Sequence, residues 1–353
     1  MTVLFAILLF SFLIFIHEFG HFFTAKLSGV QVNEFAMFMG PAIWKKQVGE
    51  TLYSIRCIPI GGYCAMEGED ADTDNPRSFQ KAAWWKRLII LVAGSAMNFL
   101  SGLLILLVLY LPAKEFVMPV IEQIEPECAL AGEYGIQLGD RILSVDGEKI
   151  YVYSDFSMLL DMNRGDVHNL VLDRNGEKIV LNDFMMEKRE FANEDGTSDL
   201  RYGFSFGTEK ADLGDKLQFV WNNAMNTVRM VRLSLKMLVQ GQVGLSDMSG
   251  PVGIVSQMSE IAEKSKTTSL AFLNLLSVGS FLAINLAVMN LLPVPALDGG
   301  RVVALLITTA VETVTRKKID PKYEGYIHSV GMLLLLGLMA VVMFKDIFVL
   351  FRG

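Results

Sequence analysis

The sequence is poor in charge and in cysteine, and both shortages narrow the class of protein. Charged residues make up 20% of the 353 residues, below the roughly 25% usual for soluble domains. Hydrophobic residues reach 52%, and the mean hydropathy is +0.39. The three cysteines, Cys57, Cys64 and Cys128, are too few and too scattered for a disulfide framework. These values exclude a disordered chain, a collagen and a disulfide scaffold, and they disfavour a water-soluble enzyme.

Negative charge is concentrated in one stretch of the chain. Residues 112 to 214 hold 10 Lys and Arg against 21 Asp and Glu, whereas the remainder holds 21 against 17. The sequence therefore predicts an acidic module inserted into a slightly basic remainder. Because duplex binding depends on neutralising phosphates with basic side chains, nucleic acid is not expected as a partner.

Four long apolar runs lie at about residues 2 to 23, 88 to 111, 270 to 292 and 326 to 344. Each is close to the ~20 residues that cross the ~30 Å hydrocarbon core of a bilayer, so we expect about four transmembrane helices. The first run starts without Lys or Arg and continues into His17, Glu18 and His21, which is not typical of a cleaved signal peptide. We therefore interpret it as a retained membrane helix.

Basic residues near the ends of these runs predict the orientation. The loop from 24 to 87 carries eight Lys and Arg, and the short connection from 315 to 323 carries four. Both are expected to be cytoplasmic, which makes the N terminus and the acidic insert extracytoplasmic. Lys345 and Arg352 leave the side of the C terminus open.

The acidic insert is predicted to be a small α/β module. Its signals are an alternating strand, two hairpin turns and a helix start, found at 116 to 124, at Asp146-Gly147 and Asn175-Gly176, and at Ser154-Asp155 before a helix to Leu160. The stretch from 131 to 150 resembles the core of a PDZ domain, a resemblance that covers roughly 114 to 210. PDZ domains usually bind an extended peptide or a C terminus at a sheet edge. A passive spacer or size filter is the alternative.

An amphipathic helix is predicted directly after this module. Apolar residues recur every three or four positions between Leu217 and Leu238. The helix is expected either in the outer membrane interface or packed against the module. The expected organisation is an N-terminal membrane part, a PDZ-like domain, an amphipathic connecting segment and a C-terminal membrane part, at 1–111, 112–212, 213–268 and 269–353.

Two of the four histidines flank an acid at the end of the first apolar run, in His17-Glu18-Phe19-Gly20-His21. On a helix, residues i and i+4 project from nearly the same face, so His17 and His21 can bind one metal ion with Glu18 beside it. This is the zinc hydrolase pattern H-E-x-x-H. A charged residue at the centre of a membrane helix costs about 2.5 to 3.5 kcal/mol, so chance retention is a poor explanation.

A third zinc ligand is needed, because catalytic zinc typically takes three protein ligands and leaves one position for water. The third apolar run ends at Asn290 and is followed by Pro293, Pro295 and Asp298. The two prolines break the helix, so we expect Asp298 on irregular chain at a depth similar to that of the two histidines. The competing third ligands, all acids of the cytoplasmic loop, are Glu34, Glu67 and Glu69.

Together, H-E-F-G-H in the first run and N-L-L-P-V-P-A-L-D-G-G after the third resemble the site-2 protease family of intramembrane zinc metalloproteases. Its bacterial branch, which includes regulators of the sigma-E and sigma-W stress responses, carries a PDZ insert between the second and third spans. The resemblance covers nearly the whole chain, including 58 to 63 and 249 to 254, and a single PDZ module favours the Gram-positive type. Where the family has a proline in the second span, this chain has Ser95, a departure that concerns local helix geometry and touches no proposed ligand.

The resemblance implies an α-helical polytopic protein of the bacterial inner membrane with one Zn²⁺ per chain near the cytoplasmic side. His17, His21 and Asp298 would bind the zinc, which lowers the pKa of its water, and Glu18 would act as general base and acid. The implied substrates are transmembrane helices of single-span proteins already trimmed outside, such as an anti-sigma factor or a signal-peptide remnant. The residues expected to contact the substrate are Asn290, Pro293, Pro295, Gly61 and Gly62.

A substrate helix must unwind locally, because its carbonyl groups are otherwise engaged in helix hydrogen bonds. The alternating stretch 52 to 58 resembles the family's membrane-dipping β-hairpin and is expected to capture the unwound peptide by strand addition. A plain surface hairpin explains the same pattern, and a helix-end cap is the alternative role for Asn290. His168 and His328 are interpreted as structural. The alternative function is a membrane-anchored PDZ peptide-binding protein with a structural metal.

Overall fold

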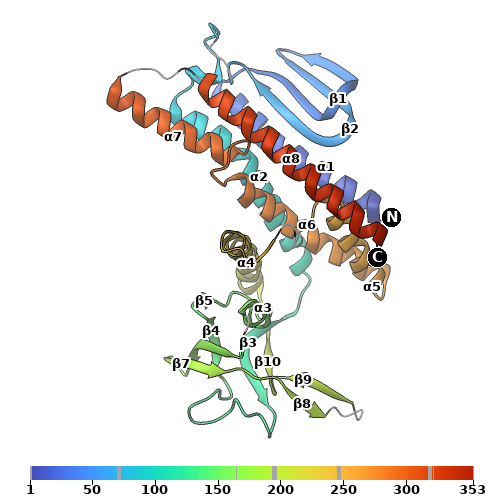
Figure 1. Ribbon diagram of the computed structural model, residues 1–353, viewed down its shortest axis with the longest axis vertical. Helices are drawn as coiled ribbons and strands as arrows, with labels where there is room; N and C mark the ends of the chain where they lie inside the picture. The colour runs from blue at the N-terminus through green and yellow to red at the C-terminus, as the bar shows by residue number, and fades with distance from the viewer. Residues whose placement is uncertain are drawn as a thin grey trace. The chain divides into compact units, whose positions relative to one another are not determined.

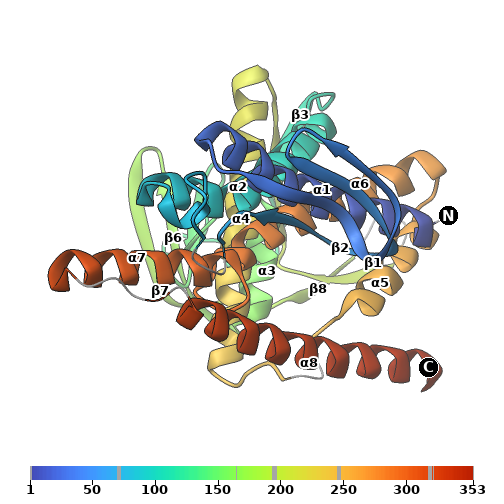
Figure 2. The same ribbon diagram turned by 90° about the horizontal axis from the view of Figure 1, so that it is seen from above.

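The chain divides into two compact units (Figures 1 and 2). The computed structural model describes residues 2–69, 73–163, 165–192, 197–244, 248–316, 320 and 322–352. The first unit combines Met1–Leu106 with Thr227–Gly353, and the second is Leu107–Asn226. The second unit is therefore an insertion into the first.

Four helices of the first unit are long and apolar enough to cross a bilayer: α1 (Thr2–Ser28), α2 (Trp84–Tyr110), α6 (Thr268–Asn290) and α8 (Lys322–Arg352). In α8 the apolar part is Gly325–Val349. The four predicted spans are confirmed, and the chain is a polytopic membrane protein with an inserted β-rich domain. Their lengths of 23 to 27 residues match the ~20 needed to span the hydrocarbon core.

Helix α1 packs into a different apolar core at each end. Near its start, Ala6 and Leu13 are buried against α6 and against α5 (Pro251–Lys264), which supplies the fully buried Met258. Near its end, Ala25 packs in a cluster with Ile90 of α2 and Phe35 of the following sheet. Both ends of α1 are therefore fixed by burial of apolar side chains.

The chain after α1 forms a folded-over β-hairpin of β1 (Val32–Val48) and β2 (Thr51–Met66). The first half of β1 pairs on both sides, because Phe35 is opposite Tyr53 and also opposite Cys64. The start of β2 is likewise paired twice, since Tyr53 also lies opposite Lys46 in the second half of β1. Within the described residues, the segment from Gly62 to Met66 takes all its ladder partners from the first half of β1, so it forms an edge of this sheet.

The expectation that the stretch 52 to 58 captures a substrate strand is therefore wrong in its first half. Residues Leu52 to Ile55 have β1 on both sides and present no free backbone edge. The alternating pattern correctly indicated a strand, but alternation does not tell an inner strand from an edge strand.

The third span ends at Asn290, as the two prolines predicted, and a short connection leads into α7 (Asp298–Thr315). Turn hydrogen bonds close this connection, for example from the Val294 amide to the Leu292 carbonyl at 2.7 Å. Asp298 was expected on irregular chain, but it is the first residue of α7. The sequence analysis did not predict this helix, whose start directs the Asp298 side chain.

The second unit contains a sheet of strand order β10-β3-β4-β6-β7, with β5 paired to β4, and a separate β8-β9 hairpin. The strands are β3 (Glu115–Ile124), β4 (Arg141–Val145), β5 (Glu148–Lys149), β6 (Val167–Arg174), β7 (Glu177–Met185), β8 (Arg189–Ala192), β9 (Ser198–Arg201) and β10 (Phe204–Lys210). Helix α3 (Ser154–Met162) contributes the fully buried Phe156 to the core of this unit. Helix α4 (Leu213–Val239) follows, so the amphipathic pattern did mark a helix.

The predicted hairpin turns of the second unit are present. Asp146 and Gly147 have φ values of 50° and 80°, and Asn175 and Gly176 have values of 53° and 87°, as in the primed turns that match strand twist. One detail was wrong: Asp155 does not cap the start of α3. Its Oδ2 instead accepts hydrogen bonds from the backbone amides of Tyr151 and Val152, which precede the helix, at N···O distances of 2.7 and 3.0 Å.

Candidate metal centre

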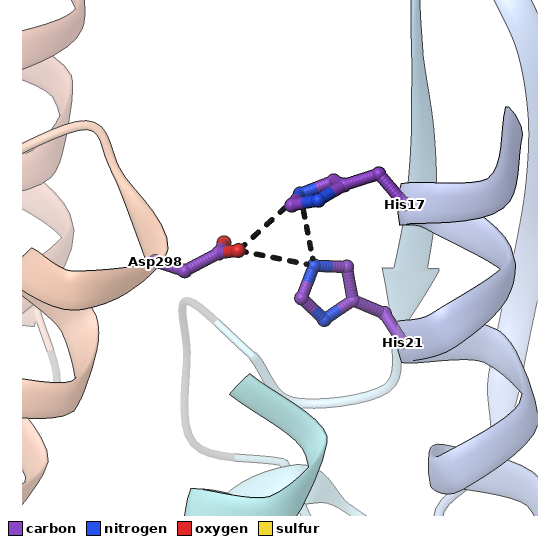
Figure 3. A group of neighbouring side chains, drawn as sticks. All are labelled: His17, His21 and Asp298. Atoms are coloured by element: carbon purple, nitrogen blue, oxygen red, sulfur yellow. Dashed lines mark hydrogen bonds and ion pairs between the residues drawn. The ribbon is translucent and has the colours of Figure 1, made fainter. Parts of the chain in front are cut away.

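Helix α1 presents His17 and His21 on one face, and the start of α7 brings Asp298 toward them (Figure 3). The two Nε2 atoms lie 3.3 Å apart. Asp298 Oδ2 lies 3.3 Å from Nε2 of His17 and 3.4 Å from Nε2 of His21. Three potential ligand atoms from two distant parts of the chain therefore converge on one point.

The ring of His21 is oriented by helix α2. His21 Nδ1 donates a hydrogen bond to the backbone carbonyl of Ile90 at 2.8 Å. With the proton on Nδ1, the lone pair of Nε2 faces the other two ligand atoms. Hydrogen bonds of this kind to the distal nitrogen fix the tautomer of metal-binding histidines.

Glycines allow α1 and α2 to approach closely enough for this arrangement. A Cβ on Gly20 would lie 2.5 Å from the Ala93 carbonyl oxygen of α2. A Cβ on Gly94 would overlap His21 Nε2 and lie 2.7 Å from His17 Cε1. Gly20 thus serves helix packing, and Gly94 leaves the space that the two imidazoles occupy.

Asp298 is held by a compact turn. Ala296 has a φ of +82°, a left-handed conformation that is uncommon for a residue with a side chain. A Cβ on Gly299 would overlap the carbonyls of Leu291 and Leu292, and one on Gly300 would overlap the Val294 carbonyl. The two glycines after Asp298 therefore let the start of α7 fold back onto the connection that precedes it.

The three donor atoms fit a zinc ion. Ligands about 2.0 to 2.1 Å from a tetrahedral zinc ion lie about 3.3 to 3.4 Å from one another, which is the spacing found here. Among the described residues, Asp298 Oδ2 and His17 Nδ1 are buried without a hydrogen-bond partner. A buried carboxylate oxygen in that state is costly unless a cation or a donor satisfies it.

The three side chains open onto a cavity of about 530 Å³. Glu18 lines it beside the histidines, and residues Tyr63 to Met66 of the β2 edge form another wall. Arg301 of α7, His328 of α8 and two acids that follow β2, Glu67 and Glu69, also line it. The cavity thus places an acid, a sheet edge and a group of potential metal ligands around one space.

Comparison with known proteins agrees with this chemistry. The model of peptidase family M50 matches residues 5–338. An inferred zinc metalloprotease of Clostridium perfringens is 36% identical over 98% of both chains. The zinc metalloprotease RasP of Oceanobacillus iheyensis is 30% identical over 98% of both chains, and the regulator of sigma-W protease RasP of Bacillus subtilis is 27% identical over the same shares.

The chain belongs to peptidase family M50. The predicted resemblance to the intramembrane zinc metalloproteases is therefore confirmed, and the protein is a metalloprotease. The match begins in the first membrane helix, includes the second and third, and ends about halfway along the fourth.

The cavity of about 530 Å³ beside His17, His21 and Asp298 is called the metal cavity below. None of the other residues predicted to contact the substrate lines it. Asn290 is the last residue of α6, and Pro293 and Pro295 line a second cavity of about 370 Å³. Gly61 lies on β2 with a φ of +76°. Gly62 packs on α1, where a Cβ would lie 3.3 Å from Glu18 Cγ. The two glycines thus belong to the strand segment that runs past Glu18.

The acids that competed with Asp298 as third ligand have partners away from the histidines. Glu34 accepts hydrogen bonds from Ser54 and Arg56 at 2.7 and 2.8 Å. Glu67 accepts one from Asn33 at 2.7 Å. Glu69 lines the same cavity as the histidines, but its carboxylate forms an ion pair with Arg301. None of the three belongs to the cluster formed by the described residues His17, His21 and Asp298.

Three residues of this M50 site were not identified from the sequence: Gly94, Arg301 and His328. Gly94 directly precedes Ser95, and Arg301 directly follows the N-L-L-P-V-P-A-L-D-G-G motif, but a glycine in an apolar helix and an arginine after a motif have many explanations. His328 was interpreted as structural, yet it lines the metal cavity. No local signal could have shown this, because its position depends on how α8 packs.

Ion pairs connect the C-terminal end of α1 to the β1–β2 turn and to the chain before α2. Hydrogen bonds from Arg77 and Lys26 lower the pKa of Glu50, in the β1–β2 turn, to about 2. The shortest of these contacts are 2.6 Å. The end of α1, the hairpin and the chain before α2 are thus held together outside the apolar core.

Proposed function

We propose that this M50 chain is a zinc-dependent intramembrane endopeptidase in which His17, His21 and Asp298 bind one Zn²⁺ and Glu18 is the catalytic acid and base. The observation that carries the proposal is the triangle of donor atoms, 3.3 to 3.4 Å on each side, beside a cavity that Glu18 lines. A structural zinc site is usually closed by four protein ligands. Three ligands and an adjoining cavity favour a catalytic site.

Bound zinc would supply a water of lowered pKa and a polarised scissile carbonyl. Glu18, one residue after His17 and on the cavity wall, would accept the proton of the attacking water and pass it to the leaving nitrogen. Ile90 would keep the proton of His21 on Nδ1 throughout. This division of roles requires only groups that line or adjoin the cavity.

The substrate proposed for this site is the transmembrane helix of a single-span protein, cut after an earlier extracytoplasmic cleavage. Anti-sigma factors and signal-peptide remnants are the expected examples, and one relative is named as a regulator of sigma-W. The unwound substrate would add to the Gly62–Met66 edge of β2, which lines the cavity through Tyr63, Cys64 and Ala65. An edge strand offers unpaired backbone groups to an extended peptide.

Further substrate contacts are proposed for Asn290, Pro293, Pro295, Gly61 and Gly62. The glycines support this role because their strand segment passes Glu18, and a bulky side chain there would separate the edge from the helix. For Asn290 the support is its place at the end of α6, from which only seven residues lead to Asp298 at the start of α7.

The acidic insert and the orientation of the chain in the membrane are the last part of the proposal. We propose a PDZ-like domain at 112–212 that faces outside and docks a new C terminus or excludes untrimmed proteins. Its acidic composition and its compact unit support a domain that is separate from the membrane parts at 1–111 and 269–353, with 213–268 as connection. The basic loops support a bacterial inner-membrane orientation with the active site near the cytoplasm.

Cleavage of a single-span model substrate by the purified enzyme in lipid vesicles tests this proposal. Glu18→Gln should keep its zinc and lose cleavage, because it removes the proton acceptor but no ligand. Asp298→Asn should lose most of its zinc, whereas Glu34→Gln, an acid engaged by Arg56, should keep it. Equal cleavage by wild type and Glu18→Gln would favour the alternative of a membrane-anchored peptide-binding protein with a structural metal.

A further inference from the structure

A second cavity lies between α7 and α8, next to the metal cavity. Its volume is about 370 Å³, within the ~300 to 1,000 Å³ range of ligand pockets. Apolar side chains of both helices line it, among them Val303, Ala304, Ile307 and Ile327, and Pro293 and Pro295 line it from the connection before α7. Charged side chains such as Arg87 and Glu312 also line it, but apolar atoms make up most of its surface, which suits an apolar side chain.

The two cavities adjoin each other. Arg301 and His328 line both of them, so the second cavity begins where the metal cavity ends. Arg301 lies one turn after Asp298 on α7, and its ion pair with Glu69 fixes it at this junction. An occupant of the second cavity would therefore reach the wall that this cavity shares with the cavity around His17, His21 and Asp298.

The position of α8 at this junction is set by a close contact. A Cβ on Gly331 would overlap Pro295 Cβ and lie 2.8 Å from the Pro295 carbonyl carbon. His328 is three residues earlier, on the same face of α8. The helix can approach the connection because residue 331 is glycine, and this approach brings His328 and Ile327 to the cavity.

We propose that the cavity between α7 and α8 is the subsite that receives one apolar side chain of the substrate next to the scissile bond. The inference rests on the proposed function and adds a specificity pocket to it. A transmembrane substrate supplies such side chains at nearly every position. In an extended peptide, successive side chains point to opposite sides, so a peptide held along the β2 edge can direct one of them away from the sheet and into this cavity.

The pocket predicts which substitutions change specificity. Ala304→Phe fills the cavity, and Ile307→Ala enlarges it. Both should therefore change which substrate side chain is preferred at one position.

The test uses wild-type enzyme and single-span substrates that carry Ala, Leu, Phe or Trp at each position around the cleaved bond. The cut site is read by mass spectrometry. Ala304→Phe should lower kcat/KM for Phe and Trp at one fixed position by about 10- to 100-fold relative to Ala, since a pocket discriminates poorly fitting side chains by this order. Ile307→Ala should shift the preference at the same position toward Trp.

Leu306→Phe is the matched control. Leu306 lies on α7 between the two test positions, is 46% exposed and does not line the cavity. It should leave the preference profile of wild type unchanged. Because the readout is a ratio between substrates, partial misfolding of a variant lowers all values together and does not imitate the result. Zinc content of each variant verifies that the metal centre is intact.

The outcomes separate this inference from the proposed function. If wild type cuts the substrates but Ala304→Phe and Ile307→Ala keep its preference at every position, the subsite assignment is wrong while the protease assignment stands. The same holds if Leu306→Phe changes the profile as much as Ala304→Phe does. If wild type and Glu18→Gln are equal on the whole panel, the proposed function itself fails.

Discussion

Helices α1 and α2 are packed far more tightly than α8, although all three adjoin the metal cavity. In the most apolar stretch of each helix, 28% of α1 and 39% of α2 is buried, against 6% of α8. Glycines bring the backbone of α1 against α2, with Gly20 on Ala93 and Gly94 on the histidines. The histidines thus lie on the closely packed side of the metal cavity. Helix α8 borders its other side, and the second cavity lies between α8 and α7.

The difference in packing between α1 and α2 on one side and α8 on the other fits two requirements of a membrane protease. Metal ligands must be held to within fractions of an ångström, which close packing provides. The substrate that we propose, a transmembrane helix, would enter from the lipid, and a helix with few buried residues can be displaced at a smaller loss of apolar burial. The same substitution should therefore have different consequences on the two sides of the cavity.

The largest effect is expected from Gly94→Ala. The added methyl group overlaps His21 Nε2, so the imidazoles must move and the donor triangle is lost. We expect a folded protein with little bound zinc and no cleavage, measured by metal analysis and by the substrate assay. Gly337→Ala is the control, because a Cβ on that α8 residue meets nothing within 4 Å. If Gly94→Ala retained full zinc, the packing of α2 would not determine the metal centre.

A smaller effect is expected from Gly331→Ala on α8. The methyl group pushes α8 away from Pro295, but none of the proposed zinc ligands is among its nearest neighbours. We expect unchanged zinc content and a loss of cleavage of about 10- to 100-fold, because small misplacements of groups beside a reacting bond cost rates of this order. Loss of zinc in Gly331→Ala comparable to that in Gly94→Ala would show that the two sides are equally rigid.

Asp346 tests how the far end of α8 is held. Its carboxylate is 5% exposed and accepts the amides of Gly250 and Gly253 at the start of α5, at 2.8 and 2.9 Å. Asp346→Ala leaves these amides without an acceptor, at roughly 1 to 3 kcal/mol each. Hydrogen exchange at both amides should accelerate about tenfold or more, whereas Asp346→Asn, which keeps an oxygen acceptor, should accelerate it less. Equal exchange in all three proteins would contradict this role.

The smallest effect concerns Glu50 at the polar end of α1. Its pKa of about 2 in the folded protein is below the 4.5 of an unperturbed glutamate. Its contribution to stability is therefore complete above about pH 4.5 and disappears as the pH falls toward 2. Because the pair is partly exposed, the contribution is at most about 1 kcal/mol. Thermal unfolding from pH 5 to pH 2.5 should depend less on pH in Glu50→Gln than in wild type, and identical slopes would contradict the assignment.

Local patterns predicted those parts of the molecule whose geometry is local. Residues i and i+4 of a helix share a face whatever surrounds it, so the sequence alone brought His17 and His21 together. Asp-Gly and Asn-Gly tolerate positive φ values, so two neighbouring residues were enough to predict each hairpin turn of the second unit. The four spans followed from length and hydropathy.

Features that depend on contacts between distant segments were not predicted. The acceptor that orients His21 is 69 positions away, at Ile90. Which half of β2 is the free edge depends on how β1 folds over it, and alternation of side chains is the same in both halves. The run from 88 to 111 was likewise predicted as a membrane span without a role for Gly94, because that role depends on how α2 packs on α1.

The sequence by itself determined that this is a four-span membrane protein with a histidine pair on its first helix, because hydropathy and helical spacing are properties of neighbouring residues. The tertiary structure alone decided that Asp298 begins a helix facing that pair, that Gly94 leaves room for the imidazoles, and that His328 borders two cavities. These features arise from helices packing across the fold, and such packing is set by the shape of both partners together.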